Sequence, residues 1–174
     1  MLNHCNLKKG EAIFLQARDP HAYISGDIME CMAASDNVIR AGFTPKFKDV
    51  EVLVNCLTYS YNDVEQQKLQ AAKFSRGSGA ANFALYDPPI DEFSVLQISF
   101  DKGVSGVGLC KAIDGPSILI VTDGEGKLRV AGDESSTLKA STGNIYFIAP
   151  GADIELISEK KDVPFTSYRA YCEA

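Results

Sequence analysis

The sequence predicts an all-β protein. Its 14 glycines and 7 prolines are spread along the chain, and they separate short runs rich in Val, Ile, Phe and Tyr. Residues 93–100 (FSVLQISF) alternate between two faces, which is typical of a strand with one buried side. Helical spacing of apolar residues recurs over one stretch, and there we expect a short helix from Asp49 to Leu57. Short strands with little helix favour a small β-barrel or sandwich.

The expected strands show the same pattern along the whole chain, with short apolar runs bounded by turn residues. Residues 117–122 (SILIVT) form a continuous apolar run, which predicts a strand buried on both faces. The sequence Asp-Gly-Glu-Gly at 123–126 predicts a hairpin turn that leads into the next strand. The remaining strands are expected at 11–17, 21–25, 27–34, 38–43, 106–112, 127–132, 136–140, 144–148, 153–157 and 164–172.

The polar segment in the middle of the chain predicts two domains. Residues 61–81 are polar and end in RGSGAA, so we interpret them as a helical or polar linker. The domains would then be residues 1–60 and residues 82–174, and one or two short helices would lie between the two sets of strands.

Net charge and cysteine content indicate which partners and which cellular compartment to expect. The net charge is −6, so nucleic acid is not expected as a partner, and an anionic ligand would need a local cationic pocket. No apolar run reaches the roughly 20 residues of a membrane-spanning helix, and the first ten residues do not resemble a secretory signal. The five cysteines are odd in number and form no CxxC or CxxH pair. This pattern indicates free thiols and a cytoplasmic protein.

The candidate chemistry is concentrated in residues 20–46, PHAYISGDIMECMAASDNVIRAGFTPK. His21 follows a proline turn at the start of an expected strand, where an imidazole can ligate a metal or make an ordinary hydrogen bond. Arg40 lies in an apolar stretch and must either bind an anion or pair with Glu30 or Asp36.

The acidic residues and the lysine of this stretch each have two interpretations. Glu30 lies between Met29 and Cys31, so it is a candidate for proton transfer or for a buried salt bridge. Asp36 lies in a Ser-Asp-Asn turn and is either a turn former or a site residue. Lys46 is either solvated or a contact for an anion.

The same stretch resembles the signature segment of type I mannose-6-phosphate isomerase (phosphomannose isomerase). The match runs without a gap from His21 to Lys46 and includes the letters HAY, ECMA, SDN, RAG and TPK. The flanks LKKGEAIFLQARDPHAY and FKDVEVLVNCLTY are also similar to that family, and YDPPIDEFSV and the ending YRAYC resemble its C-terminal domain. The resemblance therefore covers nearly the whole chain, and it is strongest up to about residue 60.

The resemblance implies a fold and an activity. The fold would be a cupin-type jelly-roll barrel followed by a second small cupin-like barrel. Residues 1–60 would be the C-terminal part of the catalytic cupin domain, and residues 82–174 the C-terminal cupin-like domain. The family is zinc-dependent and interconverts mannose 6-phosphate and fructose 6-phosphate, which supplies GDP-mannose synthesis.

The resemblance also assigns roles to residues. Zinc in the family is held by a Gln-x-His pair, a Glu and a later His, which corresponds to His21. The active-site arginine corresponds to Arg40. Four further residues fall on positions that line or neighbour the site, namely Tyr23, Glu30, Asp36 and Lys46.

The sequence departs from the family in its metal ligands, and this changes the activity expected of the chain. No Gln-x-His pair precedes His21, and one imidazole cannot hold catalytic zinc tightly, because such sites use three protein ligands. We therefore expect a C-terminal fragment or a partial gene model of the isomerase, inactive alone, whose partner is the missing N-terminal half of the same protein.

Two alternatives have different chemistry. The first is a non-catalytic cupin-like binding or regulatory module, and an upstream Gln-x-His strand in the source transcript would argue against it. A cupin dioxygenase or epimerase would need several histidine ligands, and the sequence has two histidines in all.

Overall fold

The computed structural model describes residues 2–35 and 38–173 of the chain. These residues divide into two compact units, 1–70 and 71–174, called here the N-unit and the C-unit. The segment 61–81, which we expected to be a linker, contains helix α2 (Val64–Gln67) and three short strands, β2 (Lys68–Leu69), β3 (Ala72–Lys73) and β4 (Gly77–Gly79). Regular structure in this segment therefore contributes to both units.

The N-unit contains little regular structure. Strand β1 (Ala12–Ile13) pairs antiparallel with β2. The predicted helix is confirmed as α1 (Val50–Cys56), and it begins where the Asp49 carboxylate accepts a hydrogen bond from the Val52 amide at 3.0 Å. A side chain that accepts from an otherwise unpaired N–H group stabilises the first turn of a helix. No helix among the described residues is long and apolar enough to cross a membrane.

The prediction of three strands in the N-unit is wrong. Residues 21–25, 27–34 and 38–43 have no strand structure, and the strand expected at 11–17 is reduced to the two residues of β1. A strand needs a neighbour that pairs with its N–H and C=O groups. Within the described part of the N-unit, only the β1–β2 pair supplies such a neighbour. Arg40 therefore does not lie in a strand.

The described part of the N-unit also lacks a buried core. No described residue from 2 to 70 is buried, and large apolar side chains are open to solvent. The most exposed are Phe43 at 97%, Tyr61 at 92%, Phe47 at 83% and Ile24 at 81%. Exposed apolar side chains in such number are unusual on the surface of a folded unit.

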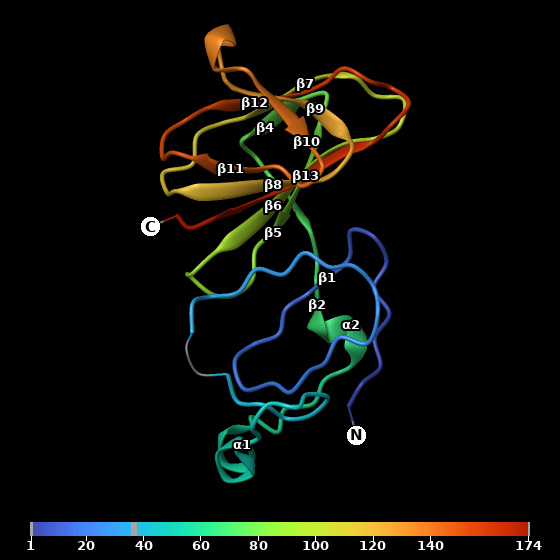
Figure 1. The fold of residues 1–174 in the computed structure, drawn as a ribbon, viewed down its shortest axis with the longest axis vertical. Coiled ribbons are helices and arrows are strands. Elements are labelled where there is room, and N and C mark those ends of the chain that lie inside the picture. The colour runs from blue at the N-terminus through green and yellow to red at the C-terminus, as the bar shows by residue number, and fades with distance from the viewer. Residues whose placement is uncertain (1, 36–37, 174) are drawn as a thin grey trace. The chain divides into compact units, whose positions relative to one another are not determined.

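The C-unit is built from two antiparallel sheets (Figure 1). One sheet has five strands in the order β10-β9-β12-β7-β4, and the other has six in the order β11-β8-β13-β6-β5-β3. The bounds are β5 Asn82–Tyr86, β6 Ser94–Phe100, β7 Gly106–Cys110, β8 Ser117–Asp123, β9 Glu125–Val130, β10 Leu138–Ser141, β11 Ile145–Ile148, β12 Ile154–Ser158 and β13 Phe165–Tyr171. A 3₁₀ turn, η1 (Glu134–Ser136), precedes β10. The strands predicted from residue 93 onward are confirmed to within two residues at each end.

The connection between β8 and β9 corrects the hairpin expected at 123–126. The two strands belong to different sheets, so they do not pair with each other. Gly124 has a φ of +76°, and a Cβ atom there would lie 2.0 Å from the Pro164 carbonyl oxygen. A glycine in this left-handed conformation turns the chain from one sheet into the other at a point with no room for a side chain.

The hydrophobic core lies between the two sheets. Leu96, Ile98 and Phe100 of β6 are buried in alternation, as the sequence predicted. Phe100 is the cross-strand partner of Phe165 on β13, and their rings stack with centroids 5.7 Å apart. Interdigitating apolar side chains from two inner faces are the usual core of a β-sandwich.

Strand β8 is buried on one face, which contradicts the prediction that both faces are covered. Leu119 and Val121 point into the core, whereas Ile118 is 55% exposed. Its neighbours across the sheet are Phe147 on β11 and Ala170 on β13. The apolar run in the sequence therefore arises because the outer face of β8 is also hydrophobic. No described part of the chain covers Ile118 on that face.

Candidate functional site

The predicted site residues all belong to the N-unit, in a segment without helices or strands. His21 is exposed, and its Nδ1 atom lies 3.0 Å from the carbonyl oxygen of Asp19. Because a carbonyl oxygen only accepts hydrogen bonds, this contact requires the proton on Nδ1 and leaves the Nε2 lone pair for another partner. Metal-binding histidines commonly have this arrangement, with the second ring nitrogen donating to a backbone carbonyl.

The turn that carries this carbonyl is fixed by side chains from a distant segment. The Asp19 carboxylate accepts hydrogen bonds from the hydroxyls of Thr58 at 2.5 Å and Ser60 at 3.2 Å. Both donors follow α1 in the sequence. The segment after the helix therefore holds the turn in front of His21 in place.

Tyr23 connects His21 to the acidic residue of the site. Its ring lies 5.7 Å from the His21 ring, and its hydroxyl donates a hydrogen bond to Glu30 Oε1 at 2.8 Å. Desolvation, followed by the hydrogen bond to Glu30, raises the pKa of Tyr23 to about 12. The phenol therefore stays protonated at neutral pH and acts as a hydrogen-bond donor that orients the Glu30 carboxylate.

The remaining predicted residues are not joined to this group by any contact among the described residues. Arg40 is half-buried, and Lys46 is exposed, with its backbone N–H donating to Thr44 Oγ1 at 3.2 Å. Asp36 lies outside the described residues. The structure thus brings together His21, Tyr23 and Glu30, while the positions of Arg40 and Lys46 relative to a substrate stay predictions.

The donor atoms of the described residues decide whether this chain can hold a metal ion. Within the described ranges, no group of three His, Cys, Asp or Glu side chains lies close enough to hold a metal ion. The described residues therefore do not fit a zinc centre by themselves, although the hydrogen bond of His21 suits one ligand of such a centre.

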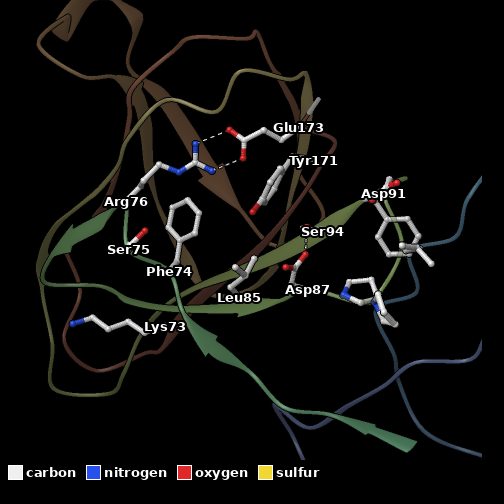
Figure 2. A pocket seen from close by; sticks show the side chains of 14 residues that line it. Lys73, Phe74, Ser75, Arg76, Leu85, Asp87, Asp91, Ser94, Tyr171 and Glu173 are labelled. Atoms are coloured by element: carbon white, nitrogen blue, oxygen red, sulfur yellow. Dashed lines mark hydrogen bonds and ion pairs between the residues drawn. The ribbon is translucent and has the colours of Figure 1, made fainter.

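Sequence reasoning missed a cavity of about 520 Å³ in the C-unit (Figure 2). Arg76 and Glu173 form a bidentate ion pair at its wall, with both N–O distances at 2.7 Å. The Arg76 guanidinium also lies 5.2 Å from the centre of the Phe74 ring. Since Glu173 neutralises this guanidinium, Arg76 does not provide an open anion site. Residues 97 positions apart form the pair, so no local motif could have indicated it.

A second feature missed from the sequence is a fully buried arginine. Arg169 on β13 donates from Nε to Ser117 Oγ at 2.8 Å and from Nη1 to Cys110 Sγ at 3.3 Å. Its Nη2 atom has no hydrogen-bond partner among the described residues. Burial lowers the pKa of Arg169 and raises the pKa of the Cys110 thiol. The signal was available in the sequence, because Arg169 takes an inward position in an alternating strand.

The fold of the C-unit defines the class of protein first. Two opposed antiparallel sheets, with successive strands crossing between them, form a cupin-type jelly roll. A solved structure of a mutant phosphomannose isomerase from Salmonella typhimurium has this fold. It aligns with a TM-score of 0.59 at 23% identity and covers 80% of this chain and 32% of that chain. The all-β cupin prediction is confirmed.

Sequence comparisons then show which proteins this chain is similar to. Residues 84–133 match the profile described as phosphomannose isomerase type I C-terminal. Mannose-6-phosphate isomerase from Ogataea parapolymorpha is 68% identical over all 174 residues, which are 40% of that protein. The enzyme of the same name from Saccharomyces cerevisiae is 57% identical over 173 residues, 39% of its length. The chain is similar to the C-terminal portion of mannose-6-phosphate isomerases, as its motifs predicted, and spans about 40% of the length of the curated relatives that it matches.

Proposed function

We propose that this chain is part of an enzyme that interconverts mannose 6-phosphate and fructose 6-phosphate and supplies GDP-mannose synthesis. The observation that carries the proposal is the 68% identity to a mannose-6-phosphate isomerase over the entire chain. The ungapped signature from His21 to Lys46 lies within that match. A phosphorylated hexose is then the substrate, and neither nucleic acid nor a membrane is a partner.

Zinc is proposed as the cofactor, with His21 as one of its ligands. The Nδ1 contact to the Asp19 carbonyl supports this role, because it leaves Nε2 for a metal. Because the described residues do not complete a metal site, the other ligands are proposed to come from a part of the protein outside this chain. Zinc would supply Lewis-acid chemistry there.

The other proposed roles follow from the charge that develops in aldose–ketose isomerisation. A proton moves between adjacent carbons through an enediol, and negative charge develops on oxygen. The Arg40 guanidinium stabilises that charge, and Lys46 or Arg40 itself binds the phosphate. Glu30 and Asp36 are the candidates for the proton-transfer base. Tyr23 holds the Glu30 carboxylate through the 2.8 Å hydrogen bond.

The proposal includes a partner and a compartment. The exposed apolar side chains of the N-unit support packing against the missing N-terminal half of the same protein. The 174-residue chain alone is then inactive. None of its five cysteines forms a disulfide, which supports a cytoplasmic location.

The test compares the chain alone with a full-length hybrid. In the hybrid, this chain replaces the matching 40% of the Ogataea parapolymorpha relative. We expect the hybrid to bind one zinc ion and to convert mannose 6-phosphate, and the chain alone to do neither. Zinc-dependent turnover by the 174-residue chain would contradict the fragment proposal, and an inactive but folded hybrid would contradict the proposed activity.

Histidine substitutions test the metal ligand within that hybrid. His21→Ala should lower both the zinc content and kcat, the latter by about 100-fold, because it removes one of the four protein ligands that the family resemblance implies. His4→Ala is the matched control and should change neither quantity, since His4 has no proposed role. Full zinc content in the His21→Ala hybrid, measured by metal analysis, would remove His21 from the ligand set.

A further inference from the structure

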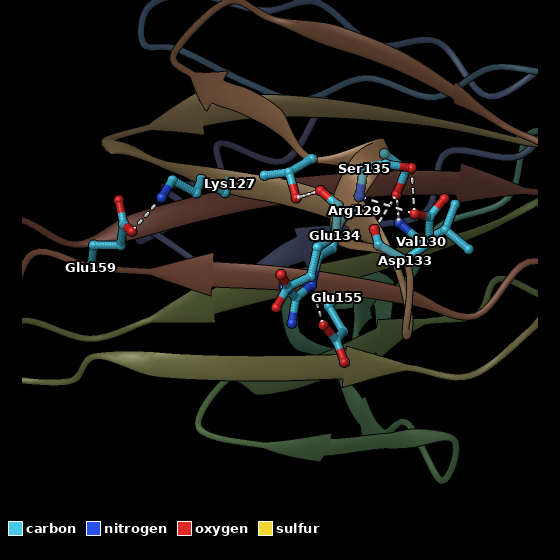
Figure 3. A network of polar contacts seen from close by, with 10 residues as sticks. Lys127, Arg129, Val130, Asp133, Glu134, Ser135, Glu155 and Glu159 are labelled. Atoms are coloured by element: carbon cyan, nitrogen blue, oxygen red, sulfur yellow. Dashed lines mark hydrogen bonds and ion pairs between the residues drawn. The ribbon is translucent and has the colours of Figure 1, made fainter.

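The two outer faces of the C-unit differ in chemistry. The outer face of the five-stranded sheet carries ion pairs, including Lys127–Glu159 at 2.5 Å and Arg129–Glu155 at 2.6 Å (Figure 3). Glu134 lies 3.8 Å from Arg129 at the same face. Charged pairs of this kind are typical of a sheet surface that faces water.

The outer face of the six-stranded sheet carries mainly apolar side chains between β11 and β6 instead. Cross-strand pairing places side chains there in two adjacent rows, which are Phe147, Ile118, Ala170 and Val95 in one row and Ile145, Ile120, Tyr168, Gln97 and Ala84 in the other. The first row continues to Tyr86 on β5 and the second ends at Lys73 on the edge strand β3, which is the one charged residue that this register adds. In the second row, the polar groups of Gln97 and Tyr168 hydrogen-bond to each other at 2.6 Å. The nine residues named first are called here the apolar sheet face.

Exposure on the apolar sheet face is greatest toward the β11 edge. Phe147 is 70% exposed, Ile145 64% and Ile118 55%. Isolated exposed apolar side chains are ordinary on protein surfaces, but contiguous ones in neighbouring strands mark an interaction site. Strand β11 also ends the sheet, so one row of its backbone groups is left for a further contact.

We propose that the part of the longer polypeptide lying outside this chain packs on the apolar sheet face. The relatives are about two and a half times as long as the chain, which covers 40% of each. A segment in the same polypeptide has a high effective concentration at this surface and needs no charge complementarity to find it. A second copy is less favoured, because each copy has a net charge of −6 and the face has no opposite charge to offset the repulsion.

This inference rests on the proposal that the chain is part of a longer isomerase, and it adds a second contact surface to that of the N-unit. It predicts that β8 and β11 are shielded in the full-length protein, whereas the ion-paired face of β9 and β12 stays in water. Covering the face would remove Ile118 and Phe147 from solvent and add to stability through burial of apolar area.

Thiol labelling tests the proposal directly. Phe147→Cys and Ile118→Cys are introduced into the 174-residue chain and into the full-length hybrid, and labelled sites are identified by peptide mass so that the native thiols do not interfere. Labelling of both should be at least about tenfold slower in the hybrid than in the chain alone. Lys127→Cys, on the ion-paired face, is the matched control and should react at the same rate in both proteins.

The outcomes separate the possible occupants. Equal labelling of Phe147→Cys in the chain and in the hybrid would overturn the proposal. Protection already present in the chain alone, increasing with its concentration, would show that a second copy covers the face and would also overturn it. Zinc content and activity of the unsubstituted hybrid are measured in parallel, so an inactive hybrid with a shielded face refutes the proposed function while it supports this inference.

A charged substitution gives a second readout that does not depend on labelling. Phe147→Lys should lower the Tm of the hybrid by several degrees but leave the Tm of the 174-residue chain unchanged, because Phe147 is already 70% exposed there. Leu138→Lys, at a 52% exposed apolar position on β10, should change neither. An equal loss of Tm in chain and hybrid for Phe147→Lys would mean that the residue stabilises the C-unit itself.

Discussion

Arg76 and Glu173 show how one residue pair holds the C-unit together across most of its sequence. The guanidinium also donates to the Ala112 carbonyl at 3.2 Å, so it connects three separate segments of the chain. The ion pair with Arg76 lowers the pKa of Glu173, and the same contact raises the pKa of Arg76. A bidentate pair with additional hydrogen bonds contributes more to stability than an ordinary surface pair.

This pair makes part of the C-unit stability depend on pH. Because the folded pKa of Glu173 is lowered, its contribution is fully present above the ordinary glutamate value of 4.5 and is lost as the pH falls below that value toward the lowered pKa. We expect Glu173→Gln to reduce the free energy of unfolding by about 1 kcal/mol at pH 7 and to have little effect at pH 3. Thermal unfolding followed at both pH values measures the difference.

The control for this prediction is another glutamate in an ion pair. Glu159 is 56% exposed in its pair with Lys127, so Glu159→Gln should change stability little at either pH. If Glu173→Gln and Glu159→Gln had the same small effect at pH 7, Glu173 would be an ordinary surface partner rather than a structural one.

At the scale of elements, the corner between β8 and β9 decides the topology. Strand β8 ends at Asp123 and β9 begins at Glu125, so Gly124 alone makes the change of sheet. Its positive φ and the 2.0 Å approach of the Pro164 carbonyl to the Cβ position both require glycine. Gly132 also has a positive φ, of +80°, but has open space around its Cβ position.

The two glycines provide a matched pair of substitutions. Gly132→Ala should destabilise the C-unit by about 1 kcal/mol, which is the cost of a left-handed backbone for alanine. Gly124→Ala should cost about 3 kcal/mol or more, because the Pro164 backbone must also move. Chemical denaturation of the 174-residue chain measures both free energies of unfolding. Equal losses for the two variants would mean that a Cβ atom fits at Gly124, contrary to the prediction.

At the scale of the molecule, the two units have unequal cores. The C-unit buries a continuous cluster around Leu96, Phe100, Leu119 and Phe165, whereas no described residue from 2 to 70 is buried. Since apolar burial is the main favourable contribution to folding, the C-unit should hold nearly all the folding free energy of this chain.

Limited proteolysis and amide hydrogen exchange test this inequality. Protease should cut the 174-residue chain within residues 1–70 and leave a resistant product that contains 71–174, whose Tm equals that of the intact chain. In the full-length hybrid the N-unit should become resistant, because its exposed side chains are then covered. Equal protection of both units in the chain alone would refute the expectation.

The strand pattern was predictable in the C-unit and not in the N-unit. The side chains of β6 alternate between core and surface, and the strands that pair with β6 are in the chain. The two-residue period of the sequence therefore corresponds to a strand that forms. Residues 21–25 have a comparable composition but lack a described neighbour to pair with. The candidate site shows the same limit, because the motif identified His21, Tyr23 and Glu30, while their mutual contacts and the hydrogen bonds of the turn before His21 are tertiary features.

By itself, the sequence predicted the all-β cupin fold and the resemblance to mannose-6-phosphate isomerases. Short alternating runs between glycines and prolines predict β-strands, and an ungapped signature indicates a family resemblance, because both are local properties of the chain. Only the tertiary structure decided that Gly124 is a corner between sheets, that Arg76 pairs with Glu173, and that the run at 117–122 faces outward at Ile118. These features depend on which distant segments meet, and local patterns carry no record of that.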